Sequence, residues 1–225
     1  MKVSVPQLVP DPRLPPAKRI LEAAKALFAS RGYEQTTTAM IARQAGTSES
    51  QIVKHFETKE GLLATIFNDG WSRIAQQLEG LRSIKSGLDR LEVLVSVLMN
   101  AFRSDPALKE LMLFEGRRMR REGQLMLTNG YLSFVRVVDE CLEQMRLNGE
   151  LNPELDTQAL RSGFIGMFEG MLRDQLLAAR SNYPADYSLE AMQLVFRHVL
   201  NSFLVNNSGP CENPFLRASD GGSLK

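Results

Sequence analysis

The chain has 225 residues and a formal net charge of +1, and hydrophobic residues make up 44% of it. This length suits one small and one larger folded unit, and no uninterrupted run of about 18 apolar residues predicts a membrane span. The proline-spaced stretch over residues 1–16 lacks the apolar segment of a signal peptide, so we expect a cytoplasmic protein.

The beginning of the chain predicts an arm followed by a helix. Residues 1–14 are expected to form a flexible arm, because prolines at positions 6, 10 and 12 do not fit a regular helix. A helix is predicted over about 16–31, with a proline in its first turn, where proline is favoured. Its apolar stripe, which should pack on the segment that follows, consists of Ile20, Ala24, Leu27 and Phe28.

The stretch over 36–59 predicts two short helices joined by a tight turn. Thr37 can cap the first helix, and Gly46 can end it, because glycine readily takes the left-handed conformation found after helices. Ser48 and Gln51 fit a capping box, in which the serine hydroxyl accepts from the third helical amide and the glutamine reaches back. The spacing indicates a helix-turn-helix, whose second helix fits a DNA major groove. An ordinary helical hairpin is the alternative.

Many residues over about 17–63 stand at fixed offsets that are specific to one family. They are Ile20-Leu21, Ala23-Ala24, Leu27-Phe28, Gly32, Thr36-Thr37, Ile41-Ala42, Ala45-Gly46, Ser48, His55-Phe56 and Lys59-Glu60-Gly61-Leu62-Leu63. In these positions the chain resembles the tetracycline-repressor-like (TetR) family of transcriptional regulators. The resemblance implies an all-α fold of about nine helices. Val53 departs from the family, which usually has a tyrosine there that contacts a DNA phosphate.

The resemblance also implies how the chain divides into domains. A flexible arm over 1–14 precedes a three-helix helix-turn-helix DNA-binding domain over 15–62. A helical ligand-binding and dimerisation domain covers 63–206, and a flexible tail follows over 207–225. Apolar patterns predict helices over about 59–80, 86–103, 122–147, 154–181 and 187–206, with another beginning at Pro106. The helix over 59–80 starts beside the DNA and ends in the second domain, so it should link the two mechanically.

The second helix of the pair is expected to face DNA, because Ile52 and Phe56 turn its apolar stripe inward. Residues 1–60 hold nine Lys or Arg against six Asp or Glu, a balance that suits phosphate contacts. Lys59 resembles a phosphate contact of the family. The residues predicted to bind DNA are Thr37, Thr38, Ser48, Glu49, Ser50, Gln51, Val53, Lys54, His55 and Lys59.

Aromatic and apolar residues from several helices of the second domain are candidates for a ligand pocket: Trp71, Met99, Phe102, Phe114, Tyr131, Phe134 and Phe168. Such residues at helical spacing also form ordinary core. Trp71 and Tyr131 add polar ends that could orient a mostly apolar molecule. The basic run over 117–121 is either a contact for an anionic ligand or a solvated helix end.

Three glycines, Gly163, Gly166 and Gly170, lie among apolar residues of the penultimate predicted helix. A glycine costs up to about 1 kcal/mol in a helix interior, so these need a physical reason. Close approach of another helix is one reason, and room for a ligand is the other. The last two helices resemble the family's dimer interface, which implies an interface made by Gly163, Gly166, Met167, Gly170, Phe196, Val199 and Phe203.

These features together predict a homodimeric, ligand-responsive transcriptional regulator. We expect a repressor that a small, mostly apolar molecule releases from a palindromic double-stranded DNA operator. A transcriptional activator and a ligand-independent architectural DNA-binding protein are the alternatives. His55 and His198 belong to no nucleophile elbow, zinc spacing or phosphate loop, so an enzyme is not expected. Cys141 and Cys211 form no metal-binding or redox motif, which predicts two free thiols and no metal or cofactor.

Overall fold

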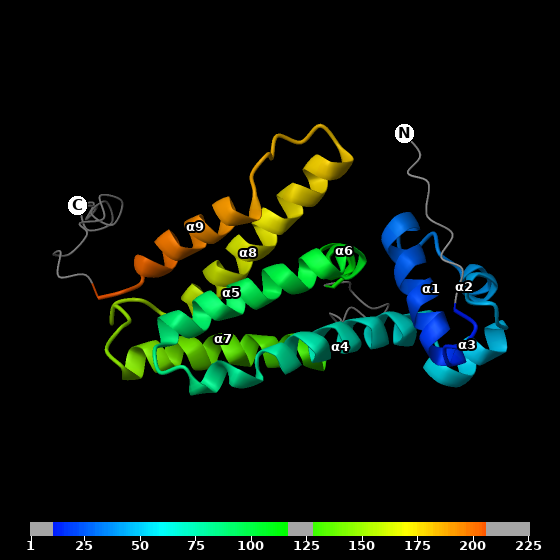
Figure 1. Cartoon of the computed structure of the whole chain (residues 1–225), viewed down its shortest axis with the longest axis horizontal. Coiled ribbons are helices and arrows are strands. Elements are labelled where there is room, and N and C mark those ends of the chain that lie inside the picture. The colour runs from blue at the N-terminus through cyan, green and yellow to red at the C-terminus, as the bar shows by residue number, and fades with distance from the viewer. Residues whose placement is uncertain (1–10, 117–127, 206–225) are drawn as a thin grey trace, which may run out of the picture.

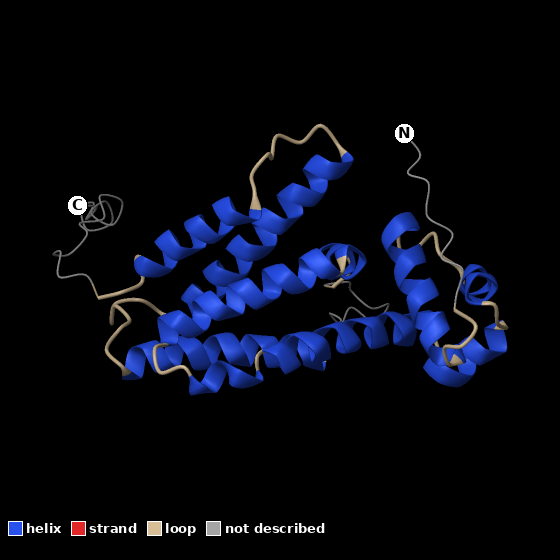
Figure 2. Ribbon diagram, in the orientation of Figure 1, coloured by secondary structure: helices blue, strands red, loops and turns tan. Residues whose placement is uncertain are grey.

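The computed structural model describes residues 11–116 and 128–205, which form nine α-helices and one short 3₁₀ helix (Figures 1 and 2). The predicted all-α fold is therefore confirmed. In chain order the helices are α1 (Pro16–Arg31), α2 (Thr38–Ala45), α3 (Glu49–Phe56), α4 (Lys59–Gln77), η1 (Glu79–Ser83), α5 (Gly87–Ser104), α6 (Pro106–Phe114), α7 (Asn129–Leu147), α8 (Thr157–Arg180) and α9 (Leu189–Asn201). None of the helices in these ranges is long and apolar enough to span a bilayer.

Helices α1, α2 and α3 form a compact unit at one end of the molecule, and α5, α7, α8 and α9 form a long bundle at the other (Figure 1). Helix α4 runs from the small unit into the bundle, and α6 lies between the two. The small unit has its own buried core, which includes Ile20, Phe28, Ile41 and Ile52. The arrangement matches the predicted helix-turn-helix unit followed by a larger helical unit.

The ends of the short helices follow from local chemistry. The Thr37 hydroxyl accepts a hydrogen bond from the amide of Met40 at 3.2 Å, as predicted. Gly46 ends α2 with φ 61° and ψ 46°, the left-handed conformation that favours glycine. The capping box predicted at Ser48 is wrong. Its hydroxyl lies 2.8 Å from the hydroxyl of Ser50 and makes no bond to a helix amide, so the two serines satisfy each other instead.

Two of the later helices are shorter than the sequence suggested. Helix α7 begins at Asn129, because the Thr128 hydroxyl accepts from the amide of Tyr131 at 3.3 Å and caps it there. The predicted start near residue 122 and the basic run over 117–121 lie outside the described residues, as do residues 1–10 and 206–225. Helix α9 ends at Asn201, and the chain then turns back so that Leu204 pairs with Leu151.

Helix α4 belongs to two hydrophobic cores. Its first half contributes Leu62, Leu63, Ile66 and Phe67 to the core of the small unit, and Ile74 contributes to the core of the bundle. Trp71 lies between these segments and packs against both cores. Leu108 and Leu111 of α6 also belong to the small unit's core. The position of α4 therefore fixes the small unit relative to the bundle.

Candidate DNA-binding interface and ligand site

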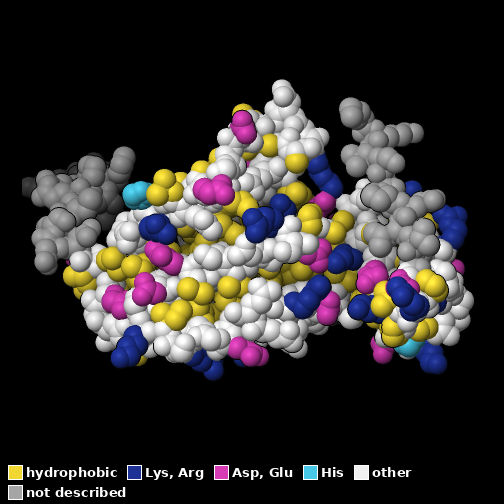
Figure 3. Space-filling model, in the orientation of Figure 1, with side chains coloured by type: hydrophobic (Ala, Val, Ile, Leu, Met, Phe, Trp, Pro, Cys, Tyr) yellow, Lys and Arg dark blue, Asp and Glu magenta, His cyan; other side chains and the backbone are white. Residues whose placement is uncertain are grey.

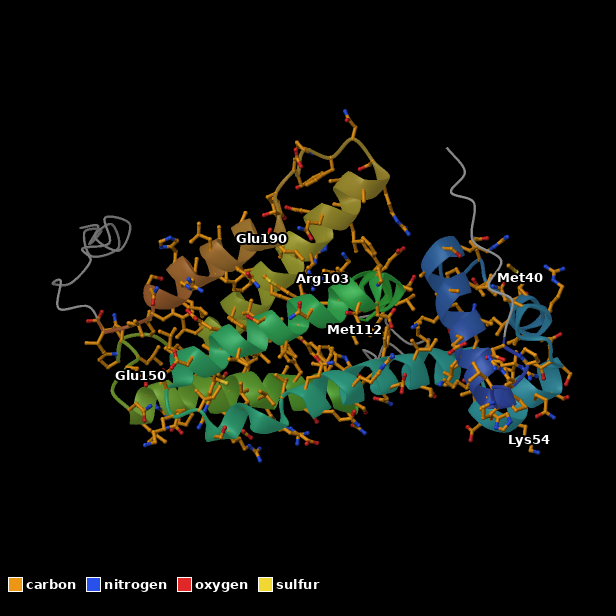
Figure 4. All side chains as sticks on the ribbon, in the orientation of Figure 1. Met40, Lys54, Arg103, Met112, Glu150 and Glu190 are labelled. Carbon is orange, nitrogen blue, oxygen red and sulfur yellow. The ribbon has the colours of Figure 1, made fainter. Side chains whose placement is uncertain are left out.

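Helix α3 has one buried and one exposed face, as a recognition helix requires. Ile52 is 1% exposed and Phe56 is 9% exposed, and both pack into the core of the small unit. The opposite face carries Val53 and Lys54, and Val53 is 59% exposed despite its apolar side chain. Figure 4 shows Lys54 at the outer end of the molecule, away from the bundle. Figure 3 shows basic and acidic side chains interspersed on the surface of this end.

The N-terminal ends of α2 and α3 lie next to each other. The Thr38 hydroxyl donates to the Glu49 carboxylate at 2.5 Å, which joins the first turns of the two helices. Five of the predicted DNA-binding residues therefore come together: Thr37, Thr38, Ser48, Glu49 and Ser50. The partial positive charge of two helix N-termini favours a DNA phosphate here, whereas the Glu49 carboxylate opposes one and Thr37 already accepts from the amide of Met40.

Lys59 occupies a more enclosed position than its predicted role implies. Its ammonium group donates to the carbonyl oxygens of Tyr33 at 3.0 Å and Thr36 at 3.1 Å, and it lies 4.1 Å from the centroid of the Tyr33 ring. The lysine thus holds the loop before α2 against the start of α4. Arg19, which the sequence did not single out, binds the carbonyl of Ala45 at 3.1 Å and fixes the turn between α2 and α3.

Five of the seven predicted ligand-binding residues line one enclosed cavity inside the bundle: Trp71, Phe102, Tyr131, Phe134 and Phe168. The Trp71 and Phe134 rings stack with centroids 5.0 Å apart, and Phe102 lies 6.1 Å from Phe168. The cavity has a volume of about 50 Å³, which is room for water but not for a drug-sized ligand. In the conformation described, aromatic side chains fill most of this space.

Two predicted ligand residues lie elsewhere. Met99 is 2% exposed and is packed in the bundle core, outside the lining of the cavity. Phe114 is the last residue of α6 and is 46% exposed, because the end of the helix turns it away from the cavity. Met112 and Leu113 of the same helix line the cavity instead. Of the described residues that line the cavity, Glu169 carries a charged side chain and the others do not.

Helix α7 touches α4 closely at the edge of this cavity. A Cβ atom placed on Gly130 would lie 2.3 Å from the Trp71 Cβ atom, so only glycine permits the approach of the two helices at this point. About three turns further along α7, burial raises the pKa of the Cys141 thiol to about 12, which keeps it protonated and unreactive. No three His, Cys, Asp or Glu side chains gather as a metal site within the ranges that the structure describes.

The predicted dimer residues divide into two groups. A Cβ atom placed on Gly163, Gly166 or Gly170 meets no atom within 4 Å, so the glycine stripe faces outward and is not needed for packing inside the subunit. Gly163 lines a shallow groove of about 340 Å³ between α8 and α9 together with Met167, Val199 and Phe203. The same surface suits contact with a second helix pair.

Phe196 does not belong to this outward surface. It is 1% exposed and lies 5.8 Å from the Phe164 ring and 5.7 Å from the Phe168 ring, in the core of the subunit. The correction follows from the side of α9 on which it lies, which it shares with the buried Met192 and Leu200. Leu194 and Val195 are the exposed apolar residues of α9, at 55% and 43%, and the sequence analysis missed them.

Comparison with known proteins identifies the family. The sequence profile described as "Bacterial regulatory proteins, tetR family" matches residues 20–66. The nucleoid occlusion factor SlmA of Aliivibrio fischeri (strain MJ11) is 31% identical over 170 residues, which cover 71% of this chain and 83% of that protein. This chain belongs to the TetR family. The predicted resemblance is therefore confirmed, and the chain is a DNA-binding transcriptional regulator with a helix-turn-helix.

Two solved structures share the fold of this TetR-family chain. The fatty acid degradation regulator FadR from Bacillus halodurans has a TM-score of 0.73 and 22% identity, covering 85% of this chain and 97% of its own. FadR from Bacillus subtilis, in complex with stearoyl-CoA, has a TM-score of 0.71 and 21% identity, covering 82% and 97%. Both similarities extend through the bundle, whereas the family profile covers α1 to α3 and the first part of α4.

The exposed face of α3 generates a prediction about DNA recognition. Replacing Lys54 by Ala should weaken binding to an operator duplex by roughly 1–3 kcal/mol if the lysine contacts a base. Gln51→Ala should weaken it as well. Lys85→Ala, an exposed lysine between η1 and α5, is the matched control and should leave affinity unchanged. Fluorescence anisotropy with labelled DNA measures all three, and unchanged affinity in both α3 variants would place the recognition surface elsewhere.

Proposed function

We propose that this protein is a homodimeric repressor that a small, mostly apolar molecule releases from a palindromic operator. The proposal rests on one observation: α4 packs into the core of the small unit and into the core of the bundle. Trp71 of α4 lines the cavity of the bundle, whereas Leu62, Leu63 and Ile66 of the same helix hold the DNA-binding unit. A molecule that displaces the wall of the cavity would therefore move the recognition helix.

Dimerisation follows from the way a helix-turn-helix reads DNA. One recognition helix reads one half-site, and two half-sites lie about 34–36 Å apart along the same face of the duplex. A shift of a few ångströms in the separation of the two helices prevents simultaneous docking. An effector then releases DNA if it binds the dimer with shifted recognition helices more tightly than it binds the DNA-binding conformation. Such a regulator acts on DNA in the bacterial cytoplasm.

The ligand class is supported by the lining of the bundle and by one relative. Aromatic rings and aliphatic side chains dominate the enclosed cavity, and Thr128 and Tyr131 add polar groups at its edge. The Bacillus subtilis FadR structure, which shares the fold, contains stearoyl-CoA. A molecule with a long apolar segment is therefore the first candidate effector. The family relationship favours a regulator over an enzyme.

An operator-release assay tests this function. Selection from random duplexes should enrich a palindrome, and footprinting should show two protected half-sites per dimer. Long-chain acyl compounds with charged heads, such as stearoyl-CoA, and with uncharged heads, such as monoacylglycerols, are then titrated into the complex, and the bound fraction is followed by anisotropy. We expect at least one of these compounds to release the DNA. Enrichment of a single half-site, or DNA binding that no apolar compound changes, would contradict the proposal.

The outward glycine stripe gives a prediction about the dimer. A Cβ atom added at Gly166 or Gly170 meets no other atom of the subunit within 4 Å, and glutamate favours helix more than glycine does. In Gly166→Glu and Gly170→Glu the subunit should therefore stay folded while the dimer dissociates and specific DNA binding is lost. Gly80→Glu in η1, where an added Cβ atom also meets no atom within 4 Å, is the control. Analytical ultracentrifugation showing intact dimers of both α8 variants would remove the glycine stripe from the interface.

A further inference from the structure

A groove on the outside of the bundle, between α4 and α7, is larger than the enclosed cavity. Its volume is about 660 Å³, within the range of about 300–1,000 Å³ that is typical of ligand pockets, whereas the enclosed cavity has about 50 Å³. The two helices run in the same direction along it, since Trp71 pairs with Phe134 near one end and Arg82 with Glu140 near the other. Of the seven ligand-binding residues predicted from the sequence, Trp71 and Phe134 line it.

The floor of the groove is apolar. Four of its residues are each less than 9% exposed: Ile74 of α4, Leu78 between α4 and η1, Leu81 of η1 and Cys141 of α7. Val137 of α7 also lines the groove and is half-buried. These side chains make the base of the groove apolar, although the four buried ones expose only a small part of their surface. An apolar segment of a ligand that covers them is removed from water, which stabilises a complex.

Uncharged polar side chains line the end of the groove nearest Trp71. They are Asn68 and Ser72 of α4 and Asn129 and Ser133 of α7. All four are exposed, and in the described parts of the chain no hydrogen bond joins their side chains to another protein group. Two amides and two hydroxyls with free donors and acceptors therefore converge from two helices on one place.

Three of the four charged residues that line the groove have protein partners: Arg82, Arg90 and Glu140. Arg82 binds both carboxylate oxygens of Glu140, at 3.1 and 2.9 Å. Arg90 donates to the carbonyl oxygens of Ile84 at 2.7 Å and Arg82 at 3.1 Å. With Glu79 as the fourth charged lining residue, acidic and basic groups balance, so the groove offers no surplus charge to an ionised ligand.

We propose that this groove is the effector site and that it takes an amphipathic molecule with an uncharged, hydroxyl- or amide-bearing head. The apolar segment lies on the floor, and the head binds Asn68, Ser72, Asn129 and Ser133. This inference rests on the proposed function and names the ligand class of that regulation. It differs from an assignment to the enclosed cavity alone, which in this conformation has no room for such a molecule.

The position of the groove explains how its occupant would act on DNA binding. The polar end lies beside the contact between Gly130 and Trp71, where α7 approaches α4 most closely. A head group inserted between Asn68 and Asn129 pushes these helices apart. Because Trp71 and Phe134 line both the groove and the enclosed cavity, the same displacement opens the stacked aromatic wall between them.

The test uses two probes with the same chain and different heads, 1-monolauroylglycerol and laurate, both below their micelle concentrations. Trp71 is the sole tryptophan, so its emission reports binding directly. We expect monolauroylglycerol to bind at least ten-fold more tightly than laurate. The double variant Ser72→Leu, Ser133→Leu should lose at least ten-fold in affinity for the glycerol ester. Gln76→Leu, Arg136→Leu, exposed on the same two helices outside the groove, is the control and should bind normally.

Two results would overturn the assignment of the groove. One is equal or tighter binding of laurate, and the other is binding of the glycerol ester that the double variant leaves unchanged. Operator release separates this failure from failure of the proposed function. If another molecule releases DNA equally well from the wild type and the double variant, the proposed regulatory function is supported and the groove is not the effector site. If the protein selects no operator sequence, the proposed regulatory function is wrong. The fluorescence titration then still tests whether the groove binds the glycerol ester.

Discussion

The packing of α4 into two hydrophobic cores is the constraint on which the rest of the structure depends. Leu63 and Phe67 lie in the core of the DNA-binding unit, and Ile74 lies two turns further along in the core of the bundle. A helix is stiff over this distance, so a displacement at Trp71 cannot be absorbed between them. The contact of Trp71 with Gly130 of α7 sets where the helix rests.

Helix α6 provides a second connection, made of charge as well as apolar packing. Lys25 of α1 binds Asp105 at 2.7 Å, and this carboxylate also caps α6 through the amide of Leu108. Arg180 at the end of α8 binds Glu110 of α6 and the carbonyl of Ala29 in α1. These contacts link α1 of the DNA-binding unit to the start of α6 and to the end of α8. A movement of the DNA-binding unit relative to α8 would therefore have to carry these partners with it or break the contacts.

The sequence predicted most where local signals decide the outcome. The turn at Gly46, the cap at Thr37 and the buried stripe of α3 are all set by neighbours in the chain, and all are found. The predictions from the sequence were wrong where tertiary packing alone determines which way a side chain faces. Helix α9 is apolar on several sides, so its pattern could not show that Phe196 faces inward while Leu194 and Val195 face outward. The groove between α4 and α7 is made by side chains more than 50 residues apart, and no spacing signals it.

The role of α4 can be tested in the proposed dimer by measuring the separation of the two DNA-binding units without DNA. Ser30→Cys on the exposed surface of α1 can carry a spin label in a Cys211→Ser background, because the buried Cys141 thiol stays unlabelled. Pulsed dipolar spectroscopy then compares the distance between the two labels in the protein with Gly130 and in the Gly130→Ala variant. The added methyl group of this variant cannot fit against Trp71. We expect the distance distribution of Gly130→Ala to be shifted by several ångströms and that of Gly80→Ala to be unchanged. Identical distributions for Gly130 and Gly130→Ala would contradict this role of α4.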